Sequence, residues 1–143
     1  MQDKNVSTSH GCDADTISRY HTLLAQAHKA KENAYCRYSG FKVGAALLAK
    51  NGSIITGCNV ENASYGLTIC AERATIVKAV SMGYRPGDFE AIAIAASNPD
   101  FSPCGACREV INEFGDDMMV IFEFKGEIIT TELKELLPFS FKL

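Results

Sequence analysis

The segment EAIAIAASNPDFSPCGAC at residues 90–107 contains the elements that decide the fold. Its opening residues, EAIAIAA, are partly β-branched and apolar toward both faces, which is typical of a buried central strand. The SNPD sequence at 97–100 then interrupts the strand, because Asn, Pro and Asp favour turns. A short helix is expected from Cys104 to about Phe114, where Gly115 is a suitable stop. The segment therefore predicts a strand, a turn and a helix in the order typical of α/β domains.

The sequence before this segment predicts a helix followed by a hairpin. Apolar residues at spacings of three and four follow Asp15, a suitable N-cap, and predict a helix that ends near Ala34. Two strand-like runs, 42–49 and 53–58, flank the sequence KNG at 50–52. Because Asn-Gly readily adopts the positive φ of a tight turn, we expect these runs to form a hairpin.

The other periodic segments complete the order of elements. They are a helix from Ala71 to a stop at Gly83, strands at 118–124 and 127–129, and a last helical turn or two at 131–137. The order α-β-β-α-β-α-β-β-α predicts an α/β domain, a three-layer α/β/α sandwich around a mixed five-stranded sheet. We expect residues 15–143 to form this single domain and residues 1–14 to be a polar, solvated tail.

The composition narrows the class of protein. The chain has 143 residues, of which 14 are Lys or Arg and 17 are Asp or Glu, giving a net charge of −3. This acidic balance disfavours nucleic acids and anionic membranes as partners. The longest apolar run, residues 91–96, is far shorter than the roughly 20 residues of a spanning helix. No secretory signal is visible in the polar N-terminal residues, so we expect a cytoplasmic protein whose cysteines are thiols or metal ligands.

Three of the six cysteines have a spacing that suits a metal ion. Cys104 and Cys107 are three residues apart and share one face of the predicted helix, so they can chelate one ion. Cys70 lies at the start of another predicted helix, two residues before Glu72. Three protein ligands with an open position are typical of catalytic zinc sites, whereas structural sites have four. The sequence therefore predicts one catalytic Zn²⁺ per chain, with Arg73 and the two helix N-termini offsetting the thiolate charge.

Glu72 is the natural general base beside such an ion, because a carboxylate there can take a proton from water and deliver it elsewhere. Taken alone, it could instead be a carboxylate that stabilises a helix N-terminus. Two other classes of protein also fit the cysteines. One is a zinc-stapled binding module, which needs a fourth protein ligand, and the other is a redox protein that uses Cys104 and Cys107. The remaining cysteines, Cys12, Cys36 and Cys58, are interpreted as ordinary thiols.

The metal motif is similar to that of a known enzyme family. The sequences CAE at 70–72 and PCGAC at 103–107 match the zinc signature of nucleobase deaminases. With YSGFKVGAA at 38–46, GCNVENASY at 57–65 and LLPFSF at 136–141, the chain resembles the short cytidine deaminases with three cysteines. The resemblance implies a cytidine deaminase-like fold. It also implies zinc-dependent hydrolytic deamination of cytidine and 2′-deoxycytidine to uridine and 2′-deoxyuridine, with release of ammonia, in pyrimidine salvage.

The resemblance also implies a role for each matching residue. The zinc ligands are Cys70, Cys104 and Cys107, and Glu72 moves protons. Substrate contacts are expected from Phe41 on the pyrimidine face, Asn59 and Glu61 on the ribose hydroxyls, and the Ala71 N–H on the O2 atom of the base. Short family members form homotetramers, in which residues matching Ala63, Tyr65 and Phe141 reach into a neighbouring subunit's site.

Each binding residue also has a simpler interpretation. Phe41 could be an ordinary core residue, Asn59 and Glu61 could cap a turn, and Tyr65 and Phe141 could be packing aromatics. Within the enzyme class, relatives act on blasticidin-like antibiotics or on polynucleotide cytosines. The acidic composition and the lack of a basic aromatic groove disfavour polynucleotides. The Asn59 and Glu61 pair favours a free nucleoside, because residues two apart on an extended segment point the same way.

Overall fold

The computed structural model describes residues 6–8, for which only the backbone is considered, and residues 11–143. Its elements in chain order are β1 (Val6–Thr8), α1 (Ala14–Lys31), β2 (Val43–Ala49), β3 (Ile54–Cys58), η1 (Tyr65–Leu67), α2 (Ala71–Ser81), β4 (Phe89–Ala96), α3 (Gly105–Phe114), β5 (Met119–Phe124), β6 (Glu127–Glu132) and α4 (Leu133–Leu136). Within the described ranges, no helix combines the length and hydropathy needed to cross a membrane.

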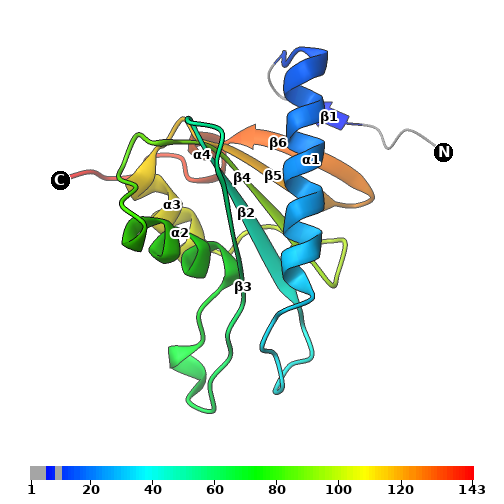
Figure 1. Cartoon of the computed structure of the whole chain (residues 1–143), viewed down its shortest axis with the longest axis vertical. Helices are drawn as coiled ribbons and strands as arrows, with labels where there is room; N and C mark the ends of the chain where they lie inside the picture. Colours follow the sequence, from blue (N-terminus) through cyan, green and yellow to red (C-terminus); the bar gives the residue numbers. More distant parts are fainter. Residues whose placement is uncertain (1–5, 9–10) are drawn as a thin grey trace.

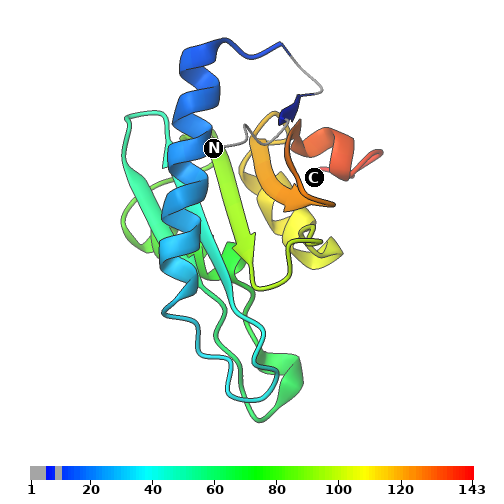
Figure 2. The same cartoon turned by 90° about the vertical axis from the view of Figure 1, so that its right-hand side faces the viewer.

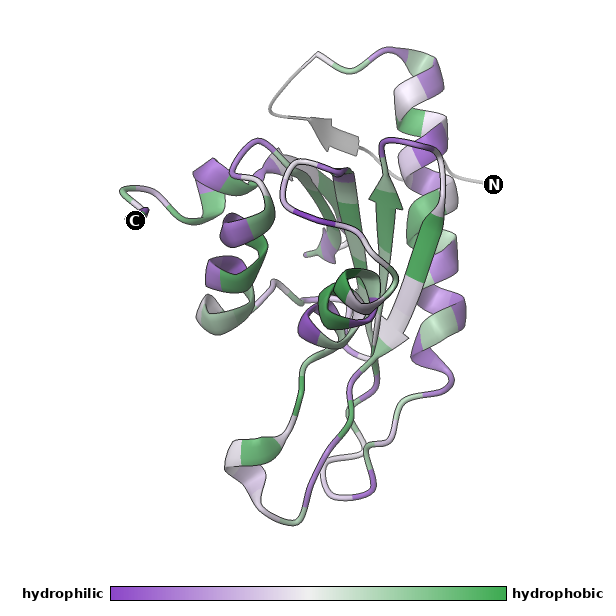
Figure 3. Ribbon diagram, turned by 60° about the vertical axis from the view of Figure 1, so that its left-hand side comes forward, coloured by the Kyte–Doolittle hydropathy of each residue, from purple (hydrophilic) through white to green (hydrophobic). Residues whose placement is uncertain are grey.

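Strand β4 lies inside a mixed sheet whose strand order is β1-β6-β5-β4-β2-β3. Its partner β5 runs parallel to it and β2 antiparallel. Alternate side chains of β4 enter two cores: Ile92 and Ile94 pack under α2 and α3, and Ala93 faces α1. The helices therefore cover both faces of the sheet (Figure 1). Hydrophobic residues concentrate on the strands, and hydrophilic and hydrophobic residues alternate along α1 (Figure 3).

The predicted three-layer arrangement with a mixed sheet is confirmed, and its five predicted strands are β2 to β6. A sixth short strand, β1, falls within the segment expected to be a polar tail. It pairs in parallel with β6, with Val6 opposite Ile128 and Thr8 opposite Thr130. Val and Thr favour strands, but a three-residue run whose partner lies far along the chain has no local pattern that identifies it.

The hairpin and the end of α2 agree with the sequence analysis. Strands β2 and β3 pair antiparallel, and Gly52 in the turn between them has a φ of +90°. Helix α2 ends at Ser81, and Gly83 follows its C-cap with a φ of +104°. Both glycines adopt a left-handed conformation that other residues rarely accept.

The prediction that Asp15 caps the first helix is wrong. Asp13 is the N-cap of α1, and its Oδ1 accepts the backbone N–H of Thr16 at 2.8 Å. Asp15 lies in the first turn, where its charge suits the helix dipole. The helix also ends at Lys31 instead of near Ala34. Asp13 and Asp15 are two residues apart, and both suit the N-cap position. The path of the backbone before the helix decides which of them occupies it.

Two loops project together beyond one end of the sheet (Figures 1 and 2). We call residues 35–41 and 59–69 the lobe. Tyr35 pairs with Val60 and Val60 pairs with Ile69 through isolated β-bridges, which hold the two loops side by side. The second loop was expected to be irregular, and η1 is its one helical turn among the described residues. The first loop of the lobe lies between α1 and β2, and the second connects β3 to α2.

Candidate active site

Two helix N-termini bring the three predicted metal ligands together. Cys70 is the N-cap of α2, Cys104 is the N-cap of α3, and Cys107 lies in the first turn of α3. Their sulfur atoms all lie within 4.8 Å of one another. Helix α3 joins the parallel strands β4 and β5, so this cluster lies at the carboxyl end of β4, where α/β sheets usually bind ligands.

The cluster fits one zinc ion per chain. Zn–S bonds of about 2.3 Å in a tetrahedral site separate the sulfurs by about 3.8 Å, which these side chains reach with small adjustments. Within the described part of the chain, no fourth His, Cys, Asp or Glu joins the cluster. Three sulfur donors with an open position suit a catalytic zinc better than a structural one. The other cysteines of the chain lie outside the cluster: Cys12, Cys36 and Cys58.

The surroundings of Cys70 favour the ionised thiol that a metal requires. A hydrogen bond from Cys107, supported by Arg73, holds the pKa of the Cys70 thiol well below its ordinary value. The Arg73 Nη2 atom lies 3.4 Å from the Cys70 sulfur. Cys104 Sγ accepts the backbone N–H of Cys107 at 3.4 Å, as an N-cap does. The guanidinium and the two helix N-termini thus provide the positive field that stabilises thiolates.

Glu72 is buried beside this cluster without a hydrogen-bond partner for one of its oxygens. Its exposed fraction is 1%, and Oε1 has no partner among the described residues. Burial is the main cause that raises the pKa of this carboxyl to about 7. A buried carboxyl oxygen without a partner is unfavourable in a resting protein, so its retention points to a role in binding or chemistry. A pKa near neutrality suits a group that both accepts and donates a proton.

A pocket of about 210 Å³ opens onto Glu72. Its lining residues come from the lobe, from β2, from the N-terminus of α2 and from the segment before α3: Phe41, Val43, Asn59, Glu61, Thr68, Cys70, Ala71, Glu72, Phe101 and Cys104. The structure therefore brings seven of the predicted site residues to one cavity. Cys107 is buried behind it in the cluster, and Arg73 lies beside Cys70.

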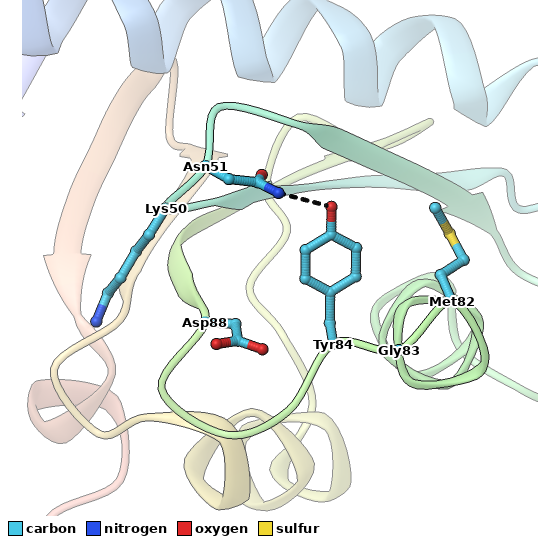
Figure 4. A pocket seen from close by; sticks show the side chains of 6 residues that line it. All are labelled: Lys50, Asn51, Met82, Gly83, Tyr84 and Asp88. Carbon is cyan, nitrogen blue, oxygen red and sulfur yellow. Dashed lines mark hydrogen bonds between the residues drawn. The ribbon is translucent and has the colours of Figure 1, made fainter.

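A larger pocket of about 570 Å³ lies elsewhere (Figure 4). It adjoins Met82, Gly83 and Tyr84, which follow the C-terminal end of α2, whereas Cys70 caps the N-terminal end. Asn51 Nδ2 donates to the Tyr84 hydroxyl at 3.3 Å, so these polar groups bind each other. Cys70 and Cys104 of the metal-ligating cluster line the smaller pocket, so the smaller pocket is the candidate active site.

The Asn59 amide holds the segment that carries Phe41. Asn59 Nδ2 donates to the Phe41 carbonyl at 2.8 Å, and Asn59 Oδ1 accepts the Val43 N–H at 2.9 Å. The ring of Phe41 lies 6.1 Å from that of Phe101, tilted by 36°. The two aromatic rings thus form an apolar wall of the pocket, and the buried Asn59 side chain fixes the backbone of one of them.

Glu61 is oriented by the other loop of the lobe. Its Oε1 accepts the backbone N–H groups of Tyr38 and Ser39, each at 3.0 Å, and its Oε2 accepts the Ser39 hydroxyl. The hydrogen bond from the Ser39 hydroxyl is the main cause that holds the pKa of Glu61 below its ordinary value. Glu61 is therefore ionised at neutral pH and can accept a further hydrogen bond from a ligand hydroxyl.

Three predicted residues lie outside both the pocket and the cysteine cluster. Ala63 and Tyr65 are in the exposed part of the lobe, and Tyr65 is 77% exposed. Tyr65 lines a neighbouring pocket that shares Glu61 with the site. Phe141, which is 69% exposed, lies near Glu109 on the outer side of α3. None of the three lines the pocket of its own chain.

The sequence analysis missed several residues that shape the site, among them Val43 in the pocket lining. Phe101 and Thr68 line the pocket, and Arg108 holds the segment before α3. Arg108 Nε donates to the Pro103 carbonyl at 2.8 Å, and Nη1 donates to the Leu136 carbonyl at 2.9 Å. An arginine directly after the second cysteine of the pair was the available signal for Arg108. The roles of Phe101 and Thr68 depend on contacts across the fold, and no local pattern marks them.

The chain is similar to known proteins over most of its length. A family model of the cytidine and deoxycytidylate deaminase zinc-binding region matches residues 17–123, which is most of the chain. The chain belongs to the cytidine and deoxycytidylate deaminase family. The region matched to this deaminase family includes every predicted site residue except Phe141.

Similar proteins include a cytidine deaminase from Sporosarcina psychrophila. It is 49% identical over 122 residues, which cover 83% of this chain and 88% of that protein. A cytidine deaminase from Halalkalibacterium halodurans is 48% identical over 122 residues, covering 83% of this chain and 91% of its own. The crystal structure of cytidine deaminase from Burkholderia pseudomallei aligns with a TM-score of 0.81 and 46% identity, covering 85% of this chain and 98% of that one. The fold of this deaminase is thus that of its solved relatives.

Proposed function

We propose that the protein catalyses zinc-dependent hydrolytic deamination of cytidine and 2′-deoxycytidine to uridine and 2′-deoxyuridine, with release of ammonia. The observation that carries the proposal is the buried Glu72 carboxyl, which opens into a pocket beside three cysteine sulfurs. The similarity to cytidine deaminases over most of the chain supports the same reaction. Pyrimidine salvage is the usual context of this activity.

Cys70, Cys104 and Cys107 would hold the zinc, which when bound supplies an acidified water at the open position. Glu72 would take a proton from the attacking water and deliver it to N3 of the base, while the hydroxide that remains adds to C4. The same carboxyl then takes the proton of the new C4 hydroxyl and gives it to the departing amine, and the C4–N bond breaks as the carbonyl of uridine forms. One water is consumed and one ammonia is released, so protons and atoms balance. Arg73 remains positively charged beside the thiolates throughout.

The lining of the pocket supports a nucleoside as the substrate. Phe41 would stack on the pyrimidine, and the Ala71 N–H would meet O2 of the base, since the first N–H groups of a helix lack partners within it. Asn59 and Glu61 would receive the ribose hydroxyls. The described residues that line the pocket include Glu61 and Glu72 but no Lys or Arg. A 5′-phosphate would find no positive partner there, which favours cytidine over its nucleotides.

The substrate is tested by the ultraviolet absorbance change on deamination, with protein whose zinc content per chain is measured. We expect turnover of cytidine and 2′-deoxycytidine, and at least about a hundredfold lower kcat/KM for the 5′-monophosphate dCMP, because the phosphate meets no cationic side chain. Activity should disappear with a chelator and return with zinc. Blasticidin S serves as the comparison substrate. Turnover of blasticidin S without cytidine would contradict the proposal, and so would a zinc-loaded protein that deaminates neither.

We further propose a cytoplasmic homotetramer in which Ala63, Tyr65 and Phe141 complete the site of a neighbouring subunit. Exposed apolar side chains in the lobe and at the C-terminus, including Tyr65 and Phe141, support an interface. The three metal-binding thiols need a reducing compartment, which supports the location. Light scattering on eluted protein is expected to give four times the chain mass of 15.5 kDa. A monomeric mass with full activity would contradict the shared site.

A further inference from the structure

The hydroxyl group of Ser39 connects two parts of the pocket that would hold different parts of a nucleoside. It donates to Glu61 Oε2, and its oxygen accepts the backbone N–H of Phe41 at 3.0 Å. Because a serine has one hydroxyl proton and the Phe41 N–H occupies a lone pair, that proton is directed to Glu61. The serine thus has a fixed orientation although its side chain lies at the surface of the lobe.

Glu61 has only one well-defined way to accept a ligand hydroxyl while these bonds persist. A carboxylate offers about four lone-pair sites, and three are taken by Tyr38 N–H, Ser39 N–H and the Ser39 hydroxyl. Without the Ser39 hydroxyl, Oε1 alone would be anchored, and Oε2 could swing about that anchor. Phe41 would stay in place, since Asn59 holds its carbonyl independently. Loss of the hydroxyl should therefore affect the sugar end of the pocket more than the base end.

We propose that Ser39 is a positioning residue that orients Glu61 for recognition of the ribose hydroxyls. The inference rests on the proposed nucleoside deaminase function and deepens it, because it assigns sugar recognition to a residue outside the pocket lining. It explains why both oxygens of the half-buried Glu61 carboxylate are bound by one short segment of the lobe.

The test compares Ser39→Ala, Ser39→Thr and the control Ser81→Ala on cytidine and on 2′,3′-dideoxycytidine, which lacks both hydroxyls. Ser81 donates its hydroxyl to the Lys78 carbonyl at the other end of α2, so its variant removes a comparable bond far from the site. We expect Ser39→Ala to lower kcat/KM for cytidine roughly five- to tenfold, mainly because KM rises. This is the loss expected when a hydrogen bond to a charged group is removed and solvent partly replaces it. The kcat/KM for 2′,3′-dideoxycytidine should change less than about twofold in Ser39→Ala. Ser39→Thr should retain most of the wild-type kcat/KM for cytidine.

A double-mutant cycle separates positioning of Glu61 from other effects. In a Glu61→Ala background, Ser39→Ala should cause no further loss on cytidine, because the group it orients is absent. An equal loss on both nucleosides, or a loss that persists without Glu61, would overturn the inference. Calorimetric binding of uridine and 2′,3′-dideoxyuridine gives the same comparison without turnover. A protein that does not deaminate cytidine but shows this pattern in binding would disprove the proposed reaction alone.

Discussion

Replacing Glu72 with glutamine is expected to lower kcat for cytidine by roughly three to four orders of magnitude while the protein keeps its zinc. Glutamine has nearly the same shape but cannot accept and release a proton, and proton transfer by a positioned side chain contributes about 10² to 10⁴ in rate for each transfer it serves. Glu72 would serve more than one transfer in this reaction, which favours the upper part of that range. The measurement is kcat from the ultraviolet assay, with zinc per chain determined on the same sample.

The structure provides conditions that make Glu72→Gln a clean experiment. The side chain is 1% exposed and one oxygen has no partner, so the substitution breaks no described hydrogen bond at Oε1. Nucleoside binding should change little, because the Phe41 and Asn59 contacts remain intact. Glu127→Gln at the exposed start of β6 is the matched control and should retain full activity. Near-normal turnover by zinc-loaded Glu72→Gln would contradict the role of Glu72 as proton carrier.

The metal cluster could be predicted from the sequence because its information is local. Cys104 and Cys107 share a helical face whatever the rest of the fold does, and Cys70 lies two residues before a carboxylate. What residue spacing alone could not provide was the convergence of the two helix N-termini, which brings the three sulfur atoms to within 4.8 Å of one another. That depends on how α2 and α3 pack on the same face of the sheet. The family resemblance supplied this expectation from the motif order alone.

The hydrogen bonds that orient the site were less accessible to prediction. Ser39 and Glu61 are 22 residues apart, and Arg108 reaches the Leu136 carbonyl 28 residues away. Neither pair has a spacing that a helix or strand would impose, so the contact exists only once the fold is formed. Asn59 illustrates the same limit, because its amide holds the Phe41 and Val43 backbone in addition to its expected role at the ribose. Residue type identifies a polar group, and tertiary structure decides what it orients.

Replacing Cys107 with serine is expected to abolish activity and to lower zinc affinity at least about a hundredfold. The loss is large because removing even a hydrogen-bond partner of a metal ligand lowers metal affinity about 10- to 100-fold. Cys107 is fully buried, so no side chain from the surface can take the place of its sulfur as a zinc ligand. Cys70 and Cys104 would remain, but the chelate on α3 would be lost. Cys12→Ser is the matched control, because Cys12 is a half-buried thiol beside α1 and outside the cluster.

Thermal unfolding gives a readout of Cys107→Ser that does not depend on catalysis. Zinc that binds only the folded chain raises its Tm by mass action, so the wild-type protein and Cys12→Ser should both unfold at higher temperature with zinc than with a chelator. The Tm of Cys107→Ser should not respond to zinc, while its aliphatic core under α2 and α3 keeps it folded at room temperature. A zinc-dependent Tm that survives in Cys107→Ser would remove Cys107 from the ligand set. Deaminase activity that survives metal removal in the wild-type protein would instead favour thiol chemistry at Cys104 and Cys107.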